Sequence, residues 1–255
     1  MQHLDSIVAD IIVIGAGGCG MMAALVAAKK GAQVLLLEKT DKPGGGTAFS
    51  SKGIRAAGSR CQRAAKIPDS PELYAQDILQ RNNNESDVVL TKRLAEISGR
   101  VADFLADEAG IEFQLGGFPF GHSAQRSHSW KADKTVTDFL FEAVQRQKNI
   151  EMRFSTPVLS LAQETEGTVT GVVIEDGIVA GHKTILASGG FGASPERREP
   201  RRETFRTHTA SMVGAEGVPT GPVWRCFCDV PMAAKGATTL NDLSTDTNNA
   251  GGVWD

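Results

Sequence analysis

Three glycines and one acid are the first residues of the sequence whose spacing indicates a binding chemistry. Gly15, Gly17 and Gly20 follow the pattern G-x-G-x-x-G, and Glu38 is the first acidic residue after them. A glycine turn that opens a helix offers unpaired backbone N–H groups and the positive end of the helix dipole to a diphosphate. A carboxylate about 20 residues further on is placed to accept hydrogen bonds from ribose hydroxyls. The spacing therefore predicts a dinucleotide site.

The residues on either side of the glycines supply the elements that such a site needs. Ile11–Ile14 and Val34–Leu37 are apolar runs of strand length, and the small apolar residues between them predict a helix that ends near Gly31. Strand, helix and strand make one βαβ unit. The acid at position 38 favours an unphosphorylated ribose, hence FAD or NAD rather than NADP. The expected loop residues are Gly15, Ala16, Gly17, Gly18, Cys19 and Gly20.

Composition and charge exclude several other classes of protein. The chain has 255 residues, of which 41% are hydrophobic and 22% charged, as is usual for a globular protein. A net charge of −3 gives no reason to expect a nucleic-acid partner, and no apolar run approaches the ~20 residues of a membrane span. The N-terminus lacks a signal-peptide pattern, so a reducing, cytoplasmic location is expected. Cys226 and Cys228 have no second pair and no nearby histidine, so no metal site is expected.

The segment after Glu38 distinguishes between the two dinucleotides. A simple NAD dehydrogenase would normally continue from the second strand into another helix, whereas this chain enters a second glycine-rich loop. A loop rich in backbone donors and hydroxyls can lie along the diphosphate and ribityl chain of a flavin. FAD is therefore expected, and an NAD-dependent dehydrogenase is the alternative. The residues concerned are Gly44, Gly45, Gly46, Thr47, Ser50, Ser51 and Gly53.

The same segment resembles the flavoprotein subunits of the fumarate reductase and succinate dehydrogenase family, to which soluble fumarate reductases, L-aspartate oxidase and ketosteroid dehydrogenases belong. Members carry E-K, four residues, G-G, Asn, Ser or Thr, and then a run of small residues. This pattern is matched by Glu38, Lys39, Gly44, Gly45, Thr47 and Ser51. Three positions depart from it, because Gly46, Lys52 and Arg55 stand where the family has asparagine, glycine and asparagine.

A loop with several chemically active side chains lies further along the chain. Its residues Gly116, Gly117, Gly121, His122, Arg126 and His128 resemble the family's G-G-H-S-x-x-R-x-H loop, which passes close to the flavin. His122, Arg126 and His128 are therefore weak candidates to hold a substrate carboxylate, a group that arginine can bind with two parallel hydrogen bonds. Alternatively, these side chains bind backbone near the flavin or lie in solvent.

The remaining pattern predicts an α/β fold, namely a Rossmann-like domain with a central parallel sheet, a helical insert and a strand-rich return segment. Helices are expected within 69–80, 85–113 and 135–148, and the insert at roughly 60–149. Strands are expected at Met152–Phe154, Val158–Leu161, Val169–Ile174 and Lys183–Leu186. The turns between the strands are marked by Gly167, Gly171 and Gly177.

The resemblance adds two more stretches to the cofactor site. Val158 follows a T-P pair after which family members pack backbone against adenine. Ala187, Ser188 and Gly189 open a segment close to the family's A-T-G-G-F-G, where the chain passes directly under the cofactor. Residues 1–195 are thus expected to form the FAD-binding domain. The commonest covalent flavin link is to histidine, and the 38–59 loop contains none, so FAD is expected to be bound non-covalently.

The sequence changes character after Pro195. Residues 196–255 show no sustained helical or strand periodicity and are interpreted as an irregular remnant or the start of a capping domain. In the family, the catalytic half follows at this point, with a substrate-clamping His and Thr and a proton-donating Arg. The chain is therefore interpreted as a truncated, fragmentary or frame-shifted flavoprotein, from which little or no turnover is expected.

The function that the resemblance implies is FAD-dependent hydride transfer at a carbon–carbon bond next to a carboxylate or carbonyl. A small dicarboxylate is the favoured substrate class, as for a fumarate reductase, and an enone is the second. Ketosteroid dehydrogenase-like activity and a catalytically silent flavin-binding fragment are the alternatives. The sequence indicates no particular electron donor.

Overall fold

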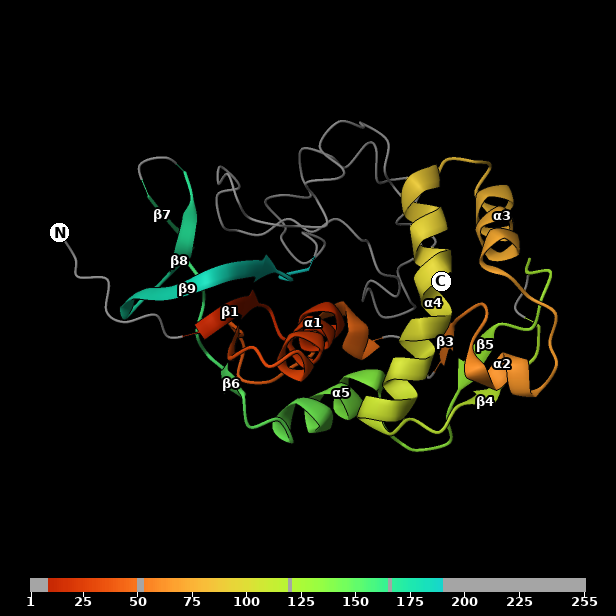
Figure 1. The fold of residues 1–255 in the computed structure, drawn as a ribbon, viewed down its shortest axis with the longest axis horizontal. Helices are drawn as coiled ribbons and strands as arrows, with labels where there is room; N and C mark the ends of the chain where they lie inside the picture. The colour runs from red at the N-terminus through yellow and green to blue at the C-terminus, as the bar shows by residue number, and fades with distance from the viewer. Residues whose placement is uncertain (1–8, 50–52, 119–120, 165–166, 190–255) are drawn as a thin grey trace, which may run out of the picture. The chain divides into compact units, whose positions relative to one another are not determined.

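The computed structural model describes residues 9–49, 53–118, 121–164 and 167–189, which form two compact units (Figure 1). The first unit combines residues 9–49 with residues 140–189, and the second comprises residues 53–139. The boundary between them along the chain falls inside α5 (Val136–Gln145). Residues 196–255, with the predicted remnant or capping segment, lie outside the described residues, as do Ser51 and Lys52.

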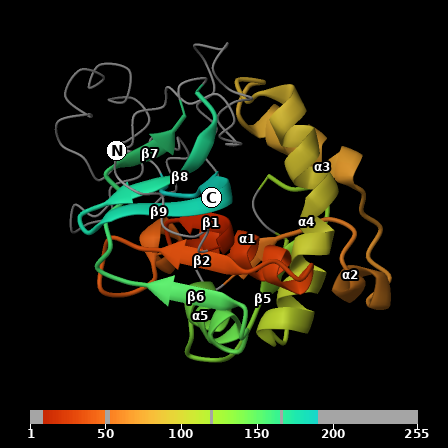
Figure 2. The same ribbon diagram turned by 60° about the vertical axis from the view of Figure 1, so that its left-hand side comes forward.

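The first unit is built on a six-stranded sheet in the order β6-β2-β1-β9-β8-β7, which can be followed in Figure 2. The strands are β1 (Ala9–Ile14), β2 (Val34–Leu37), β6 (Ile150–Arg153), β7 (Ser160–Gln163), β8 (Val169–Ile174) and β9 (Gly177–Leu186). From β6 to β9 the neighbouring strands are parallel, whereas β9, β8 and β7 pair antiparallel. The helix α1 (Gly18–Lys29) connects β1 to β2 and packs against both strands.

Burial explains why β1 and β2 are apolar without alternation. Ile12 and Val13 of β1 are completely buried. In β2, Leu35, Leu36 and Leu37 are almost completely buried. Strands covered on both faces read as continuous apolar runs, as is typical of parallel sheets. The predicted strand, helix and strand around the first glycine loop are thus confirmed as β1, α1 and β2.

The return segment differs in detail from the predicted strands. β9 begins at Gly177 and is much longer than the predicted strand at Lys183–Leu186, while Val158 precedes β7 instead of opening it. The prediction of a turn at Gly171 is wrong, because this residue lies inside β8. A Cβ there would lie 2.9 Å from the Ala180 Cα, so the glycine permits close approach of β9.

The second unit contains helices whose starts are fixed by side-chain caps. The helices that lie wholly within its described part are α2 (Arg60–Ala64), α3 (Pro71–Arg81) and α4 (Val88–Ala109), and α3 packs along α4 (Figure 1). Ser59, Ser70 and Asp87 each accept a hydrogen bond from the first turn of one helix. α4 is followed by Gly110, whose φ of 72° ends the helix in the left-handed conformation. A small antiparallel sheet in the order β3 (Gly53–Arg55), β5 (Ser127–Ser129), β4 (Gln114–Leu115) completes the unit.

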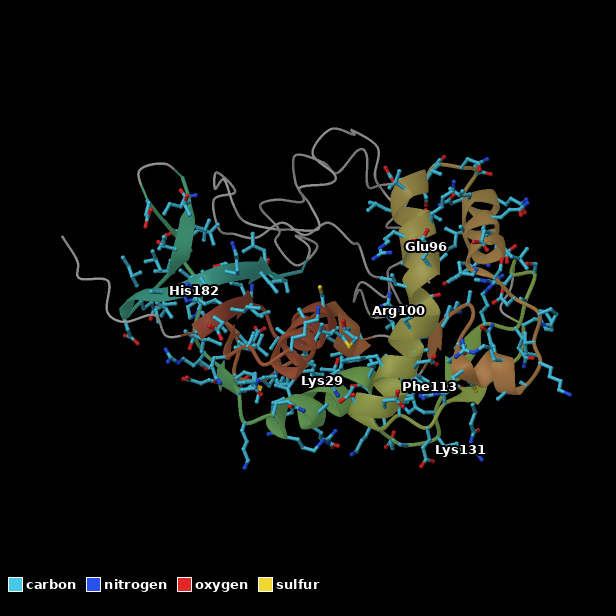
Figure 3. All side chains as sticks on the ribbon, in the orientation of Figure 1. Lys29, Glu96, Arg100, Phe113, Lys131 and His182 are labelled. Atoms are coloured by element: carbon cyan, nitrogen blue, oxygen red, sulfur yellow. The ribbon has the colours of Figure 1, made fainter. Side chains whose placement is uncertain are left out.

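One face of α4 lies close to the segment that leads into α2. A Cβ on Gly99 would lie 2.8 Å from the carbonyl carbon of Gly58, and Ser98 Oγ accepts a hydrogen bond of 3.0 Å from Ala57 N. The opposite face carries charged, exposed side chains, among them Glu96 and Arg100 (Figure 3). Among the helices of the described ranges, none combines the length and the apolar character that crossing a bilayer requires.

Candidate cofactor-binding site

The glycines of the first loop allow close backbone contacts that a side chain would block. Gly15 has φ +104°, and a Cβ there would lie 2.5 Å from the carbonyl oxygen of Ala187. A Cβ on Gly20 would overlap the carbonyl oxygen of Gly15 and lie 3.3 Å from the Ala187 Cβ. Ala187 N in turn donates a hydrogen bond of 2.9 Å to Ile14 O. The first loop and the end of β9, both predicted to line the cofactor, therefore meet in the first unit.

The second glycine-rich loop lies against the first. Gly44 N donates a hydrogen bond of 3.1 Å to Ala16 O, and Gly18 N donates one of 3.3 Å to Thr47 Oγ1. Thr47 is held in a short 3-10 helix, η1 (Gly45–Phe49). The two glycine-rich loops and the distant Ala187 are thus brought together in the first unit.

Glu38 follows β2 directly and turns its carboxylate toward the first loop. Its Oε2 accepts a hydrogen bond of 2.7 Å from Ala16 N. Its Oε1 accepts hydrogen bonds from Thr40 N at 3.0 Å and from Thr40 Oγ1 at 2.9 Å. A carboxylate has about four acceptor positions, and these contacts use three of them. The acid is therefore fixed beside the loop with capacity for a ribose hydroxyl.

The N-terminus of α1 is suited to an anion. Its N-cap is Gly17, which supplies no side-chain cap, and the first turn of the helix contains no acidic residue. Lys29 lies in the last turn, where a cation complements the other end of the dipole (Figure 3). A helix start behind a glycine turn, whose N-cap residue has no side chain to accept from the next N–H groups, is a common site for phosphates. Together with Glu38, these residues fit a diphosphate and the ribose attached to it.

The other predicted cofactor residues belong to the first unit, with two exceptions. Thr156 N donates a hydrogen bond of 2.9 Å to Glu38 O, and Val158, two residues on, is half-buried against the core of the sheet. Gly189, with φ +81°, follows Ala187. Exposed positions are Cys19, Lys39, Gly45, Gly46 and Ser188. The exceptions are Gly53, which belongs to β3 of the second unit, and Ser51, which is outside the described residues.

The three candidates for substrate contact belong to one network of the second unit, centred on Arg126. This side chain is fully buried, and Asp69 and Asp77 are its ion-pair partners. Arg126 Nε donates to Asp69 Oδ2 at 2.9 Å, Nη2 donates to Asp69 Oδ1 at 2.6 Å, and Nη1 donates to Asp77 Oδ2. The ring of Tyr74 lies 4.8 Å from the guanidinium carbon. The guanidinium is thus committed to contacts inside its own unit.

His128 is also buried and uses both ring nitrogens. Nδ1 lies 2.7 Å from Arg126 O and carries the ring proton, because a carbonyl can only accept. Nε2 therefore accepts the hydroxyl hydrogen of Ser59 at 2.6 Å, and Ser59 Oγ accepts from Gln62 N to cap α2. Burial lowers the pKa of His128, which keeps the ring neutral at pH 7. The contacts of His128 connect β5 to the start of α2.

His122 is only half-buried and differs in this respect from the other two candidates. Its Nδ1 lies 3.2 Å from Arg126 Nη1, which can only donate, so the proton of the neutral ring is on Nε2. Burial and the charge of Arg126 lower the pKa of His122. The ring is therefore neutral at pH 7 and can donate a hydrogen bond through Nε2.

The stability of the second unit should depend on the ionisation of Asp77. Burial raises the pKa of this carboxyl, but hydrogen bonds from Ser123 and Arg126 outweigh burial and hold the pKa below the ordinary value of 3.8. A lowered folded-state pKa gives a contribution that is present above about pH 4 and is lost as the pH falls through the folded pKa. We therefore expect the free energy of unfolding to fall as the pH drops below about 4, and to fall less steeply in Asp77→Asn.

Urea unfolding at a series of pH values measures this effect. Asp107→Asn is the matched control, because the Asp107 carboxylate is 55% exposed and pairs with Arg60 at the surface. It should retain the wild-type pH dependence. Equal slopes for Asp77→Asn and the wild type would contradict the assignment.

Two glycine loops and an acid at the end of the second strand, on a sheet whose strands β6, β2, β1 and β9 are parallel, define a dinucleotide-binding domain. The comparison with known families is more specific. The model of the family described as FAD binding domain matches residues 10–221, so the chain belongs to the FAD binding domain family. FAD is accordingly the cofactor, and the reading as an NAD-dependent dehydrogenase is set aside.

Similar proteins include reductases of unsaturated acids. Fumarate reductase (cytochrome) of Shewanella frigidimarina is 32% identical over 197 residues, which are 74% of this chain and 34% of that protein. Urocanate reductase of Eggerthella lenta is 30% identical over 198 residues, which are 74% and 33% of the two chains. The open conformation of a flavocytochrome c3 fumarate reductase superposes with a TM-score of 0.70 at 28% identity, over 79% of this chain and 37% of that one. The chain spans about a third of the length of these relatives. The predicted resemblance to fumarate reductase flavoproteins is confirmed.

Three contributors to these contacts were not found from the sequence. Thr40 gives a detectable signal, a hydroxyl residue two positions after the ribose acid. Asp69 and Asp77 give none, because they lie 57 and 49 residues before Arg126 and only the fold makes them its partners.

Proposed function

We propose that this chain forms the FAD-binding part of a reductase that transfers a hydride at a carbon–carbon bond next to a carboxylate. A fumarate-type dicarboxylate is the proposed substrate class. The observation that supports the proposal most is the convergence of both glycine loops, Ala187 and Glu38 at one end of the sheet, in a chain similar to fumarate and urocanate reductases. Fumarate and urocanate share a C=C bond conjugated to a carboxylate.

The residues divide the work as follows in this proposal. The N-terminus of α1 and the first loop hold the diphosphate, and Glu38 accepts from the ribose. FAD, when bound, supplies hydride transfer between its flavin and the substrate carbon. His122, a neutral donor through Nε2, is the proposed contact for a substrate carboxylate. Arg126 and His128 hold the loop that carries His122.

FAD is proposed to be bound without a covalent link, since the 38–59 loop contains no histidine. Purified protein saturated with FAD is precipitated with acid, and flavin is measured in the supernatant and the pellet. All flavin is expected in the supernatant. Flavin retained by the pellet would show a covalent link, and a protein that binds no FAD would overturn the proposal at its base.

The reaction is tested on the chemically reduced FAD complex under anaerobic conditions. Fumarate, urocanate and a 3-oxosteroid are added separately, and reoxidation is followed by the return of flavin absorbance. Reoxidation by an unsaturated acid and not by the steroid is the expected result. A complex that neither acid reoxidises would contradict the reductase proposal and leave this chain a non-catalytic FAD-binding module.

A further inference from the structure

Thr40 makes several of the hydrogen bonds that hold the carboxylate of Glu38 in the cofactor site. Its backbone N and its Oγ1 lie 3.0 and 2.9 Å from Glu38 Oε1, so one oxygen of the carboxylate has both of its described partners in a single residue. The other oxygen accepts from Ala16 N. Two fixed points, one on each oxygen, determine the rotation of the carboxylate.

The same hydroxyl also reaches the beginning of the second glycine-rich loop. Thr40 Oγ1 lies 2.8 Å from Lys42 O, so its single proton is shared between this carbonyl and the Glu38 carboxylate. Two residues after Lys42, Gly44 N donates to Ala16 O. The Thr40 side chain therefore contacts both Glu38 and the start of the second glycine-rich loop, and each of these also contacts the first loop.

The backbone of Thr40 makes a third connection, to the segment that leads to Val158. Ser155 N donates a hydrogen bond of 2.8 Å to Thr40 O, and Thr156 N donates one of 2.9 Å to Glu38 O. Ser155 has φ 49°, an uncommon conformation for a residue with a side chain, and these two hydrogen bonds hold the chain there. Thr40 thus links the acid, the second loop and the segment predicted to lie against adenine.

We propose that Thr40 is a positioning residue for the cofactor, which fixes the Glu38 carboxylate in the rotation that accepts the ribose hydroxyls. This proposal rests on FAD being the ligand of this site. Thr40 acts on the cofactor only through Glu38. A charge-assisted hydrogen bond orients a carboxylate more strongly than a neutral one, and a group held in its binding geometry loses less entropy when the ligand arrives. Removing the hydroxyl leaves the backbone contacts of Thr40 in place.

A double-mutant cycle on the full chain tests this role. Dissociation constants for FAD are measured by quenching of flavin fluorescence in the wild type, Thr40→Val, Glu38→Gln and the double variant. Thr40→Val is expected to weaken FAD binding about tenfold, which is the effect of one hydrogen bond to a charged group. In the Glu38→Gln background, the same change should weaken binding less than twofold, because the group on which Thr40 acts is altered.

Two further variants separate positioning from general damage to the fold. Thr40→Ser retains the hydroxyl and should restore wild-type affinity to within about twofold. Thr168→Val makes the same substitution at an exposed position, where the described contact is made by the backbone, and should bind FAD as the wild type does. The unfolding midpoints of the FAD-free variants should agree with that of the wild type.

The outcomes distinguish this inference from the proposed function. If Thr40→Val binds as the wild type does, or weakens binding equally in both backgrounds, Thr40 does not position the acid. If Thr40→Ser fails to restore binding, the hydroxyl is not the group responsible. A wild-type chain that does not bind FAD would instead remove the proposed function itself.

Discussion

Gly20→Ala is expected to abolish measurable FAD binding and to destabilise the first unit by about 3 kcal/mol or more, at the upper end of the usual cost of overpacking. The added methyl group would overlap the carbonyl oxygen of Gly15 and press against Ala187. Relief requires α1 to move away from the loop and from the end of β9. That movement displaces the helix N-terminus from the diphosphate position, so cofactor binding and stability are lost together.

Urea unfolding of the FAD-free chain and titration with FAD measure the two effects separately. Gly46→Ala is the control for stability, because this glycine is exposed and a Cβ there would meet no atom within 4 Å. The free energy of unfolding should change by less than about 0.5 kcal/mol in the control. A Gly20→Ala protein with wild-type stability and affinity would refute the close packing of loop, helix and strand.

Arg126→Met is expected to destabilise the second unit by about 3–5 kcal/mol, the usual cost of removing one partner of a buried ion pair. Methionine approximates the length of the arginine stem, so the main loss is the charge and its hydrogen bonds. Asp69 and Asp77 would then be left without their cation, although their side chains are only 1% and 8% exposed. Two buried carboxylates without a counter-charge are the reason for the large expected loss.

The control is Arg93→Met, which removes an arginine that pairs with Glu96 at the surface and is 65% exposed. Such pairs contribute at most about 1 kcal/mol. Thermal unfolding of both variants gives the comparison. Adding Asp69→Asn and Asp77→Asn to Arg126→Met should recover part of the loss, because the unpaired charges disappear. Equal stability of the two methionine variants would show that the buried network contributes little.

The sequence was sufficient to predict the first strand, helix and strand and the FAD-binding family, because the pattern that indicates them is short. Gly15, Gly20 and Glu38 lie within one βαβ unit, and their spacing is visible in the sequence even though the backbone that the glycines admit includes the distant Ala187. Two of these residues are glycines and the third is an acid. Their type and their spacing together are enough to indicate a dinucleotide site. The fold class follows from the same short-range pattern.

The network around Arg126 could not be predicted in this way. A lone arginine in a loop is compatible with substrate binding, with solvent exposure and with an interior ion pair, and only the positions of Asp69 and Asp77 distinguish among them. Gly171 shows the same difficulty, since a glycine that admits a neighbouring strand looks like a glycine in a turn. When the interaction partners of a residue lie in distant segments of the chain, the residue type limits which interactions are possible. Only the fold then determines which of them is made.

The placement of β9 beside β1 has a consequence for the synthesis of the protein. Ala9 pairs with Gly181, and the entire second unit is translated between them. Throughout that interval the nascent chain holds β1 with one edge unpaired, a surface that invites association with other chains. We expect the first unit to complete its sheet only after β9 has left the ribosome. The contact between Gly15 and Ala187 then forms late, and chaperones can bind the unpaired edge of β1 until it does.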